Sequence, residues 1–204
     1  MSLEPVLSSH MKPALYLLAF TLLGNQALFG QKNDIGFLFG FSQRNASLRN
    51  DVIKGEVRTS FQFNPACLLK EGGPGRLYAE IPIMTAAGLN GKINDTVTGR
   101  VAGVAFITPG LRYHINLSPR LSLYFGGGFG FAAAGERIGV PNGLQLITTK
   151  KYHWSPAGNY GGGLDYRISD HFSLRAEARD FRASRETKVP GRNTGATVGF
   201  AVRF

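Results

Sequence analysis

The sequence contains little cysteine, little histidine and little charge, and these shortages exclude several classes of protein. Cys67 is the single cysteine in 204 residues, and there are four histidines. These numbers exclude a disulfide framework and a multi-cysteine metal site, and we expect neither a metal nor any other cofactor. Charged residues make up 18% of the chain and aromatic residues 11%. Intrinsic disorder is excluded as well, because it requires few aromatic residues and a high charge.

The sequence also offers no apolar run long enough for a membrane-spanning helix. The run at 13–24 has about a dozen apolar residues, whereas a spanning helix needs about 20. Lys12 precedes this run and a short segment, 25–30, follows it, which is the pattern of a secretory signal peptide. We predict a signal peptide over residues 1–30, cleaved after Gly30 or after Ala27, and a mature domain over residues 31–204. The alternative is a buried amino-terminal helix.

Basic residues and glycine are in excess. Lys and Arg number 23 against 13 Asp and Glu, which gives a net charge of +10. The basic residues form no compact run, so nucleic acid is not an expected partner. Glycine accounts for 27 residues, which is about twice its usual share of about 7%. The composition therefore indicates one globular or membrane-embedded domain that is rich in strands.

From residue 31 onward, apolar residues recur at every second position. In the first such segment, Ile35, Phe37, Phe39 and Phe41 alternate with residues that are mostly small or polar. A period of two is typical of strands with one apolar and one polar face. Eight segments show it, and they predict strands at 34–42, 58–68, 76–86, 100–115, 120–134, 152–168, 171–184 and 194–204.

The connections between these strands alternate between long and short. The odd-numbered connections have roughly 9 to 17 residues and the even-numbered ones roughly 2 to 7, by the strand limits given above. Membrane β-barrels sort their connections in this way, with long loops on one side of the bilayer and short turns on the other. A soluble barrel has no reason to do so.

The two faces of the predicted strands differ in size as well as in polarity. The apolar face carries bulky Phe, Tyr and Leu with almost no charge, and the other face is rich in Gly, Ser and Ala. An eight-stranded barrel has an interior just wide enough for side chains to fill, so the small residues fit inside. A Lys or Arg on a lipid face at the bilayer midplane would cost about 2–4 kcal/mol. We therefore predict an all-β fold, an eight-stranded antiparallel up-and-down transmembrane β-barrel preceded by the signal peptide.

Charged residues on the inward face of this barrel require partners, because an unpaired buried charge is costly. We expect a network of Arg–carboxylate pairs that crosses the lumen and plugs it. The alternative is separate hydration of each group by lumen water, and neither interpretation implies catalysis. The predicted network consists of Glu80, Arg112, His114, Asp165, Arg167, Arg175, Glu177 and Arg179.

The last residues of the chain carry the most specific pattern. Thr197, Gly199, Val202 and Phe204 have the spacing polar-x-Gly-x-x-apolar-x-aromatic, which resembles the assembly signal of bacterial outer-membrane proteins. The segments 159–181 and 107–113 resemble the penultimate and central hairpins of small outer-membrane β-barrel domain proteins, the OmpA/OmpW-like and porin-like group. The resemblance covers nearly the whole mature chain.

This resemblance implies a location and partners. It implies residence in the bacterial outer membrane after secretion, surrounded by outer-membrane lipid and lipopolysaccharide. We expect a monomer. It also implies that the barrel-assembly machinery reads the terminal pattern. The predicted long loops contain more Lys and Arg than Asp and Glu, and attraction to anionic lipopolysaccharide is one hypothesis for this excess. Ordinary solvated loop charge is the alternative.

The resemblance implies little about molecular activity, and we expect a non-enzymatic protein with a structural, surface-binding or limited small-solute-permeation role. One alternative is an enzyme, because His153 and Ser155 resemble the His-x-Ser motif of outer-membrane lipid A deacylases. In those enzymes a carboxylate about a dozen residues further on orients the histidine. Here Arg167 occupies that place and Asp165 is the nearest acid. The other alternative is a secreted soluble barrel that binds an apolar ligand, which the sorted connections and Phe204 argue against.

Overall fold

The computed structural model describes residues 33–48, 51–93, 97–142, 145–184 and 191–204. The predicted signal peptide, residues 1–30, lies outside these ranges. No helix within the described ranges is long and apolar enough to cross a membrane. The strands are β1 (Asp34–Leu48), β2 (Asp51–Gly72), β3 (Gly75–Glu80), β4 (Ile83–Ile93), β5 (Val97–Ile107), β6 (Gly110–Asn116), β7 (Leu121–Asn142), β8 (Gln145–Arg167), β9 (Phe172–Ala183) and β10 (Arg192–Arg203).

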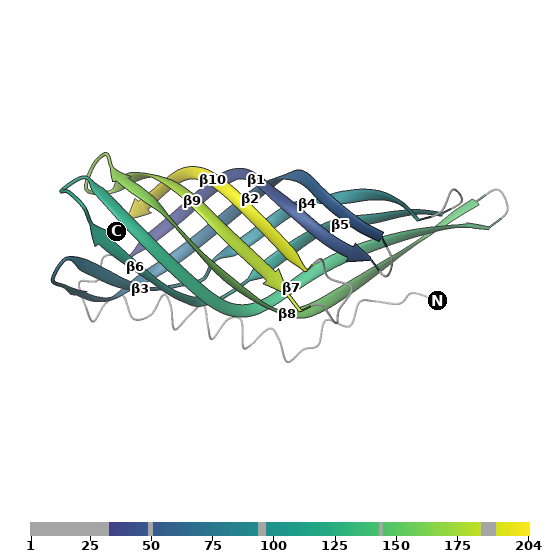
Figure 1. Cartoon of the computed structure of the whole chain (residues 1–204), viewed down its shortest axis with the longest axis horizontal. Helices are drawn as coiled ribbons and strands as arrows, with labels where there is room; N and C mark the ends of the chain where they lie inside the picture. The colour runs from purple at the N-terminus through teal and green to yellow at the C-terminus, as the bar shows by residue number, and fades with distance from the viewer. Residues whose placement is uncertain (1–32, 49–50, 94–96, 143–144, 185–190) are drawn as a thin grey trace. The chain divides into compact units, whose positions relative to one another are not determined.

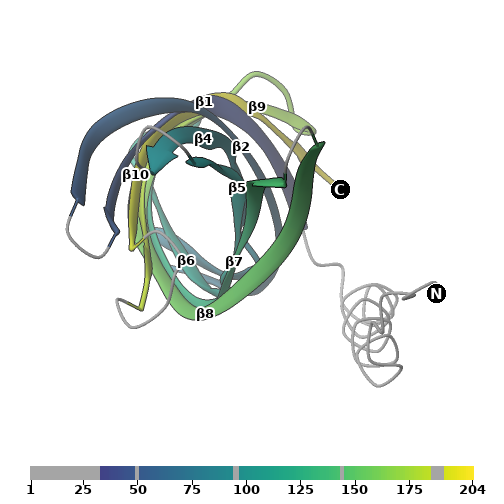
Figure 2. The same cartoon turned by 90° about the vertical axis from the view of Figure 1, so that its right-hand side faces the viewer.

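These strands form one closed antiparallel ring (Figures 1 and 2). The first and last strands close it, since β1 pairs with β10 on one side and with β2 on the other. Strand β2 pairs with both β3 and β4, and β7 pairs with both β5 and β6. The pairs β3–β4 and β5–β6 therefore each act as one interrupted strand of the wall. Ten labelled strands less two interruptions give a ring of eight, as the sequence predicts.

Proline causes both interruptions, because it has no backbone N–H to give to the ladder. Pro82 separates β3 from β4, and Pro109 separates β5 from β6. Their carbonyl groups still accept hydrogen bonds from neighbouring strands, with Thr108 N at 3.1 Å from Pro82 O and Phe129 N at 3.0 Å from Pro109 O. The wall therefore remains continuous across the two breaks.

One end of the barrel carries the short turns at 73–74, 117–120 and 168–171, together with the first residues of β1 and the last residues of β10. We call it the short-turn end. At the opposite, long-hairpin end, three of the four predicted long loops are wrong in length, and only the connection between β9 and β10 is close to its predicted length. Strands β7 and β8 stay paired to Asn142 and Gln145, and β1 and β2 to Leu48 and Asp51. Extending an existing antiparallel ladder continues its hydrogen bonds, whereas an open loop of the same length leaves those backbone groups unpaired. In Figure 1 the β7–β8 hairpin reaches well beyond β9 and β10.

The bulky apolar side chains face outward, as predicted. Phe39, Phe129 and Phe200 are 56%, 86% and 47% exposed, and they belong to a band of exposed Phe, Tyr, Leu and Trp that covers several strands. Most inward positions carry small, polar or charged residues, and a few large apolar or aromatic side chains are buried among them. This orientation is the reverse of that in a soluble barrel, whose apolar face points inward, and it matches the wall of a membrane barrel.

The lumen is filled by two layers of different chemistry. Towards the short-turn end it contains buried charged and polar side chains, which are described below. Towards the long-hairpin end it contains an apolar layer, in which the rings of Phe106 and Phe181 lie 5.3 Å apart. The other members are Met84, Ala86, Val104, Ala132, Ala134, Ala157 and Ala183. The alternation of apolar and small residues does not predict this apolar layer.

Candidate functional site

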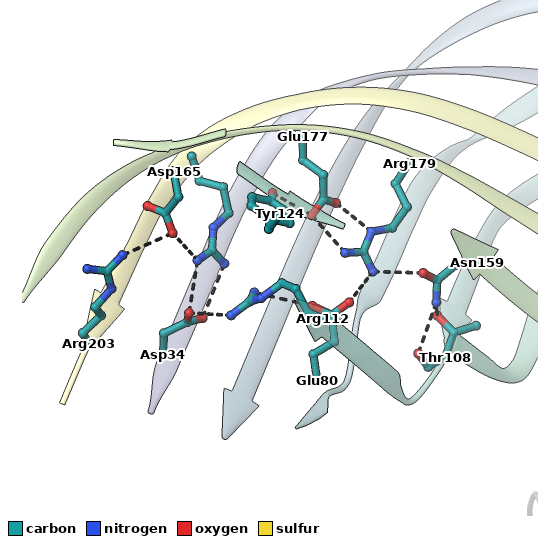
Figure 3. A network of polar contacts seen from close by, with 11 residues as sticks. Asp34, Glu80, Thr108, Arg112, Tyr124, Asn159, Asp165, Glu177, Arg179 and Arg203 are labelled. Atoms are coloured by element: carbon teal, nitrogen blue, oxygen red, sulfur yellow. Dashed lines mark hydrogen bonds and ion pairs between the residues drawn. The ribbon is translucent and has the colours of Figure 1, made fainter. Parts of the chain in front are cut away.

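The charged layer is centred on Asp34, at the first position of β1. Its Oδ2 lies 2.5 Å from Nη2 of Arg112 on β6 and 3.1 Å from Nη2 of Arg175 on β9. Arg175 also binds Asp165 of β8, at 2.8 Å, and Asp165 accepts a longer contact of 3.3 Å from Arg203 of β10. One chain of ion pairs thus joins five strands across the lumen (Figure 3).

Glu80, the last residue of β3, continues the chain toward the long-hairpin end. Its two oxygens lie 3.4 Å from Nη1 of Arg112 and 2.8 Å from Nη1 of Arg179. Arg179 pairs in addition with Glu177, at 3.0 Å from its Nε. The hydroxyl group of Tyr124 donates to the same Glu177 carboxylate at 3.0 Å. Both Glu80 and Arg179 therefore contact partners on two or more sides.

A neutral extension completes this layer. Asn159 accepts a hydrogen bond from Arg179 at 2.9 Å and donates one to the hydroxyl of Thr108 at 2.7 Å. The charges of the network balance, because four arginines (Arg112, Arg175, Arg179, Arg203) face four carboxylates (Asp34, Glu80, Asp165, Glu177). Seven of these eight side chains are at most 4% exposed, and Arg203 at the rim is 11% exposed.

Balance and burial together determine the energetics of the network. A balanced, fully buried network is only weakly stabilising relative to an apolar core, because each ion loses its hydration. Removal of one partner, however, leaves an uncompensated buried charge and costs about 3–5 kcal/mol. The network therefore penalises any arrangement in which one of its strands is absent or shifted in register.

Aromatic rings pack against the charged groups. His114 lies between Tyr78 and Tyr124, at ring-centroid distances of 5.1 and 5.0 Å, and its ring is stacked on that of Tyr124. The guanidinium of Arg112 lies 5.0 Å from the ring centre of Tyr78, and that of Arg175 lies 5.4 Å from Tyr124. These cation–π contacts replace part of the water that the guanidinium groups lose.

Two glycines on the inner wall leave the space that the network occupies. A Cβ atom on Gly126 would lie 2.9 Å from Oε1 of Glu80. A Cβ atom on Gly163 would lie 2.6 Å from the hydroxyl of Tyr124 and 2.1 Å from the carbonyl oxygen of Ala176. The high glycine content of the sequence thus has a steric role at the centre of the lumen.

The structure brings six of the eight predicted network residues into one chain of ion pairs. His114 lies among them through its ring contacts. Arg167 does not join, and the structure gives its side chain no ion pair within the described residues. It is the last residue of β8, at the rim of the short-turn end, where the lumen opens to solvent. The six joined residues are Glu80, Arg112, Asp165, Arg175, Glu177 and Arg179.

Two members of the network, Asp34 and Arg203, were missed by sequence reasoning. Both lie at the end of a strand, where alternation gives the weakest signal. Asp34 nevertheless lies in the same alternating set of positions as the inward residues Gly36 and Leu38. This alternation was sufficient to place it in the lumen. The apolar layer was missed for a different reason: Phe106 and Phe181 are bulky apolar residues that lie buried on the inward face, against the rule that such residues face outward.

The residues of the predicted assembly signal lie on β10 and just beyond it. Thr197 faces inward and accepts a hydrogen bond from Gln62 at 3.2 Å. By alternation Gly199 also lies on the inward face, whereas Val202 and Phe204 lie on the outward face. Phe204 is 53% exposed at the short-turn end, and its backbone exchanges two hydrogen bonds with Asn33.

The proposed catalytic pair of the enzyme alternative lies on β8. Ser155 is buried on the lumen side, where its hydroxyl donates to the carbonyl of Pro156 and accepts from the amide of Ser184, each at 3.1 Å. Asp165 is twelve residues from His153 on the same strand, about 40 Å away at about 3.3 Å per residue, and it pairs with Arg175. Within the described ranges, no group of three or more His, Cys, Asp or Glu side chains is placed to hold a metal ion.

A closed antiparallel ring with an apolar outer wall and a filled lumen defines an integral membrane β-barrel protein. Residues 23–204 match the family model described as "Outer membrane protein beta-barrel domain". The chain therefore belongs to this family, and the protein is located in the bacterial outer membrane.

Solved structures of outer-membrane barrels share the fold at low sequence identity. Neisserial surface protein A has a TM-score of 0.55 at 11% identity, over 84% of this chain and 97% of that one. Ail of Yersinia pestis, solved in complex with the heparin analogue sucrose octasulfate, has a TM-score of 0.50 at 14% identity, over 84% and 99%. The outer-membrane enzyme PagL reaches 0.45 at 11% identity, over 83% and 98%, a likeness too low to bear on activity. No curated protein sequence matches this chain.

Proposed function

We propose that the protein is a sealed, non-enzymatic barrel that anchors its long hairpins at the cell surface, for a structural or surface-binding role. The observation that carries this proposal is the filled lumen. The ion-pair chain from Arg203 to Glu177 crosses the short-turn half, where the short turns of such barrels face the periplasm. The buried apolar cluster around Phe106 and Phe181 lies further toward the long-hairpin end. A solute would have to displace both layers in order to pass.

Conductance measurements test the proposal. The refolded protein is inserted into planar lipid bilayers and compared with an open porin measured under the same conditions. We expect no steady unitary conductance, because a solute would have to displace the ion pairs and the apolar side chains that lie across the lumen. A reproducible unitary conductance would contradict the sealed barrel and favour the permeation role.

The position of Ser155 supports the non-enzymatic proposal over the deacylase alternative. The acyl esters of a membrane lipid lie outside the barrel wall, whereas Ser155 is 1% exposed and faces the lumen. Mass spectrometry of lipid A from cells that produce the protein is expected to show an unchanged acylation pattern. Loss of one acyl chain, abolished by Ser155→Ala, would establish the enzyme instead.

A further inference from the structure

One polar cluster lies on the outer wall of the barrel, where the membrane surrounds it. Asp180 of β9 belongs to the outward parity, together with the exposed Leu174, Ala176 and Ala178. Its carboxylate is nevertheless almost fully covered, at 6% exposure, because four side chains from the outer surface converge on it. They are Arg182, Arg192, Thr194 and Tyr160, at 2.8, 3.1, 2.8 and 2.8 Å.

Among the described residues, this outer cluster has one positive charge in excess. Two guanidinium groups share one carboxylate, and the side chains of Arg182 and Arg192 remain 54% and 49% exposed. Arg182 also lies 5.1 Å from the ring centre of Tyr160, which helps to fix its orientation. Arginines that face a membrane are costly unless they reach the interface or an anion. A phosphate group matches the planar donor fork of arginine.

The position of the cluster corresponds to the outer leaflet. The outward residues of β9 are apolar from Phe172 to Ala178 and become polar at Asp180 and Arg182. Ten residues of a strand tilted by about 40° cover about 25 Å, which is the height of the apolar band of an outer-membrane barrel. Since Phe172 is at the periplasmic end, Arg182 reaches the level of the outer headgroups.

An apolar groove adjoins the cluster on its membrane side. It has a volume of about 520 Å³, and its lining includes Ala176, Ala178 and Ala196 between the larger Phe39, Phe41 and Leu164. Ala178 pairs with Ala196 in the ladder, and the next outward pair toward the cell surface is Asp180 with Thr194. The groove thus begins two residues, about 7 Å, below the cluster.

We propose that this surface of β1, β8, β9 and β10 is a binding site for a phosphorylated, acylated lipid of the outer leaflet. The phosphate lies against Arg182 and Arg192, and one acyl chain occupies the groove above the alanines. Asp180, Thr194 and Tyr160 hold the two guanidinium groups in place. The charge excess and the apolar groove, which arise from different residues, thus fit two parts of one ligand. The inference is independent of the sealed lumen.

Binding of lipid A to the refolded full chain in neutral detergent tests this site. Affinities are measured for lipid A, for dephosphorylated lipid A, for inorganic phosphate alone and for zwitterionic phosphatidylcholine. We expect lipid A to bind at least tenfold more tightly than each of the other three. Equal affinity for the dephosphorylated form or for phosphatidylcholine would overturn the role of the arginines, and equal affinity for phosphate would overturn the role of the groove.

Three variants separate the parts of the site. Arg182→Gln with Arg192→Gln is expected to weaken lipid A binding tenfold or more, and Ala178→Phe, which fills the groove, is expected to weaken it as well. Arg120→Gln is the matched control, because this exposed arginine lies in a turn at the opposite end of the barrel. Heat-modifiable gel mobility shows that each variant is folded. Unchanged affinity in the folded double variant would refute the site.

Discussion

Asp34 on β1 holds Arg175 on β9, 141 positions further along the chain, with 3.1 Å between Oδ2 and Nη2. Between these two strands in the wall lies β10, which pairs with both. The contact therefore spans the seam where the chain closes on itself. It links the correct closure of the ring to the neutralisation of two buried charges.

Loss of the Asp34 charge is expected to destabilise the barrel. In Asp34→Asn, Arg112 and Arg175 lose the carboxylate between them, and the lumen gains a net positive charge. We expect the free energy of unfolding to fall by about 3–5 kcal/mol, measured by urea titration of the refolded protein in detergent micelles. Asp170→Asn, in an exposed turn, is the control and is expected to change little. Equal unfolding midpoints for both variants would contradict the role of Asp34.

The pair formed by Glu80 and Arg179 is expected to be strongly coupled. Each single variant, Glu80→Gln or Arg179→Met, leaves the buried network with one uncompensated charge, whereas the double variant removes both charges and restores the balance. The double-mutant cycle is therefore expected to give a coupling energy near the upper end of the usual range of about 0.5–3 kcal/mol. Additive effects would argue that the pair contributes no specific interaction.

A pair with one exposed partner provides the control for this cycle. Arg76 and Glu71 lie 3.3 Å apart, but Glu71 is 51% exposed. Solvent screens such pairs, so their coupling is expected to stay below about 1 kcal/mol. A control value as large as that of Glu80 and Arg179 would show that burial is not the cause of the coupling.

The inner-wall glycine beside Tyr124 is expected not to tolerate a side chain. Gly163→Ala brings a Cβ atom against both the Tyr124 hydroxyl and the Ala176 carbonyl, and overpacking of this kind costs about 1–3 kcal/mol. Gly72→Ala is the control, because no atom lies within 4 Å of the added group. The urea unfolding midpoints of the two variants give the comparison. Similar midpoints would mean that the wall can shift to make room.

The terminal aromatic residue is expected to matter for assembly in cells more than for folding. If the barrel-assembly machinery reads Phe204, then Phe204→Ala lowers the amount of folded protein in the outer membrane, while refolding of the purified chain into detergent is unchanged. Phe172→Ala is the control, because Phe172 is similarly exposed at the same end of the barrel, at 48% against 53%. Equal amounts of the two variants in outer-membrane fractions would contradict a signal at Phe204.

The wall was predictable from the sequence because alternation is a local property. Each strand reveals its two faces through its own residues, and the mismatch between bulky and small faces determines which one points outward. This pattern predicts the eight strands of the ring. The two proline interruptions only divide two of these strands into separately labelled halves.

The contacts inside the lumen were not predictable to the same degree, because they depend on register between strands distant in sequence. Alternation places Arg167 and Arg175 on the inward face. It does not show that Arg167 lies at the rim, because this depends on where β8 ends. Asp180 is the opposite case: alternation assigns it to the lipid face, where a charge is unexpected, and only the pairing of β9 with β10 brings Arg192 and Thr194 to it. The lengths of the hairpins likewise depend on pairing and not on composition.

The projecting hairpin of β7 and β8 has a consequence for the solubility of the cell-surface end. Beyond Ala157, where its pairing with β9 ends, one margin of β8 has no partner strand within the part of the chain described. Such a margin invites intermolecular strand addition unless it is guarded. The sequence places Pro156 at its base and Lys150 and Lys151 along it, residues that discourage edge-to-edge aggregation between neighbouring cells or copies.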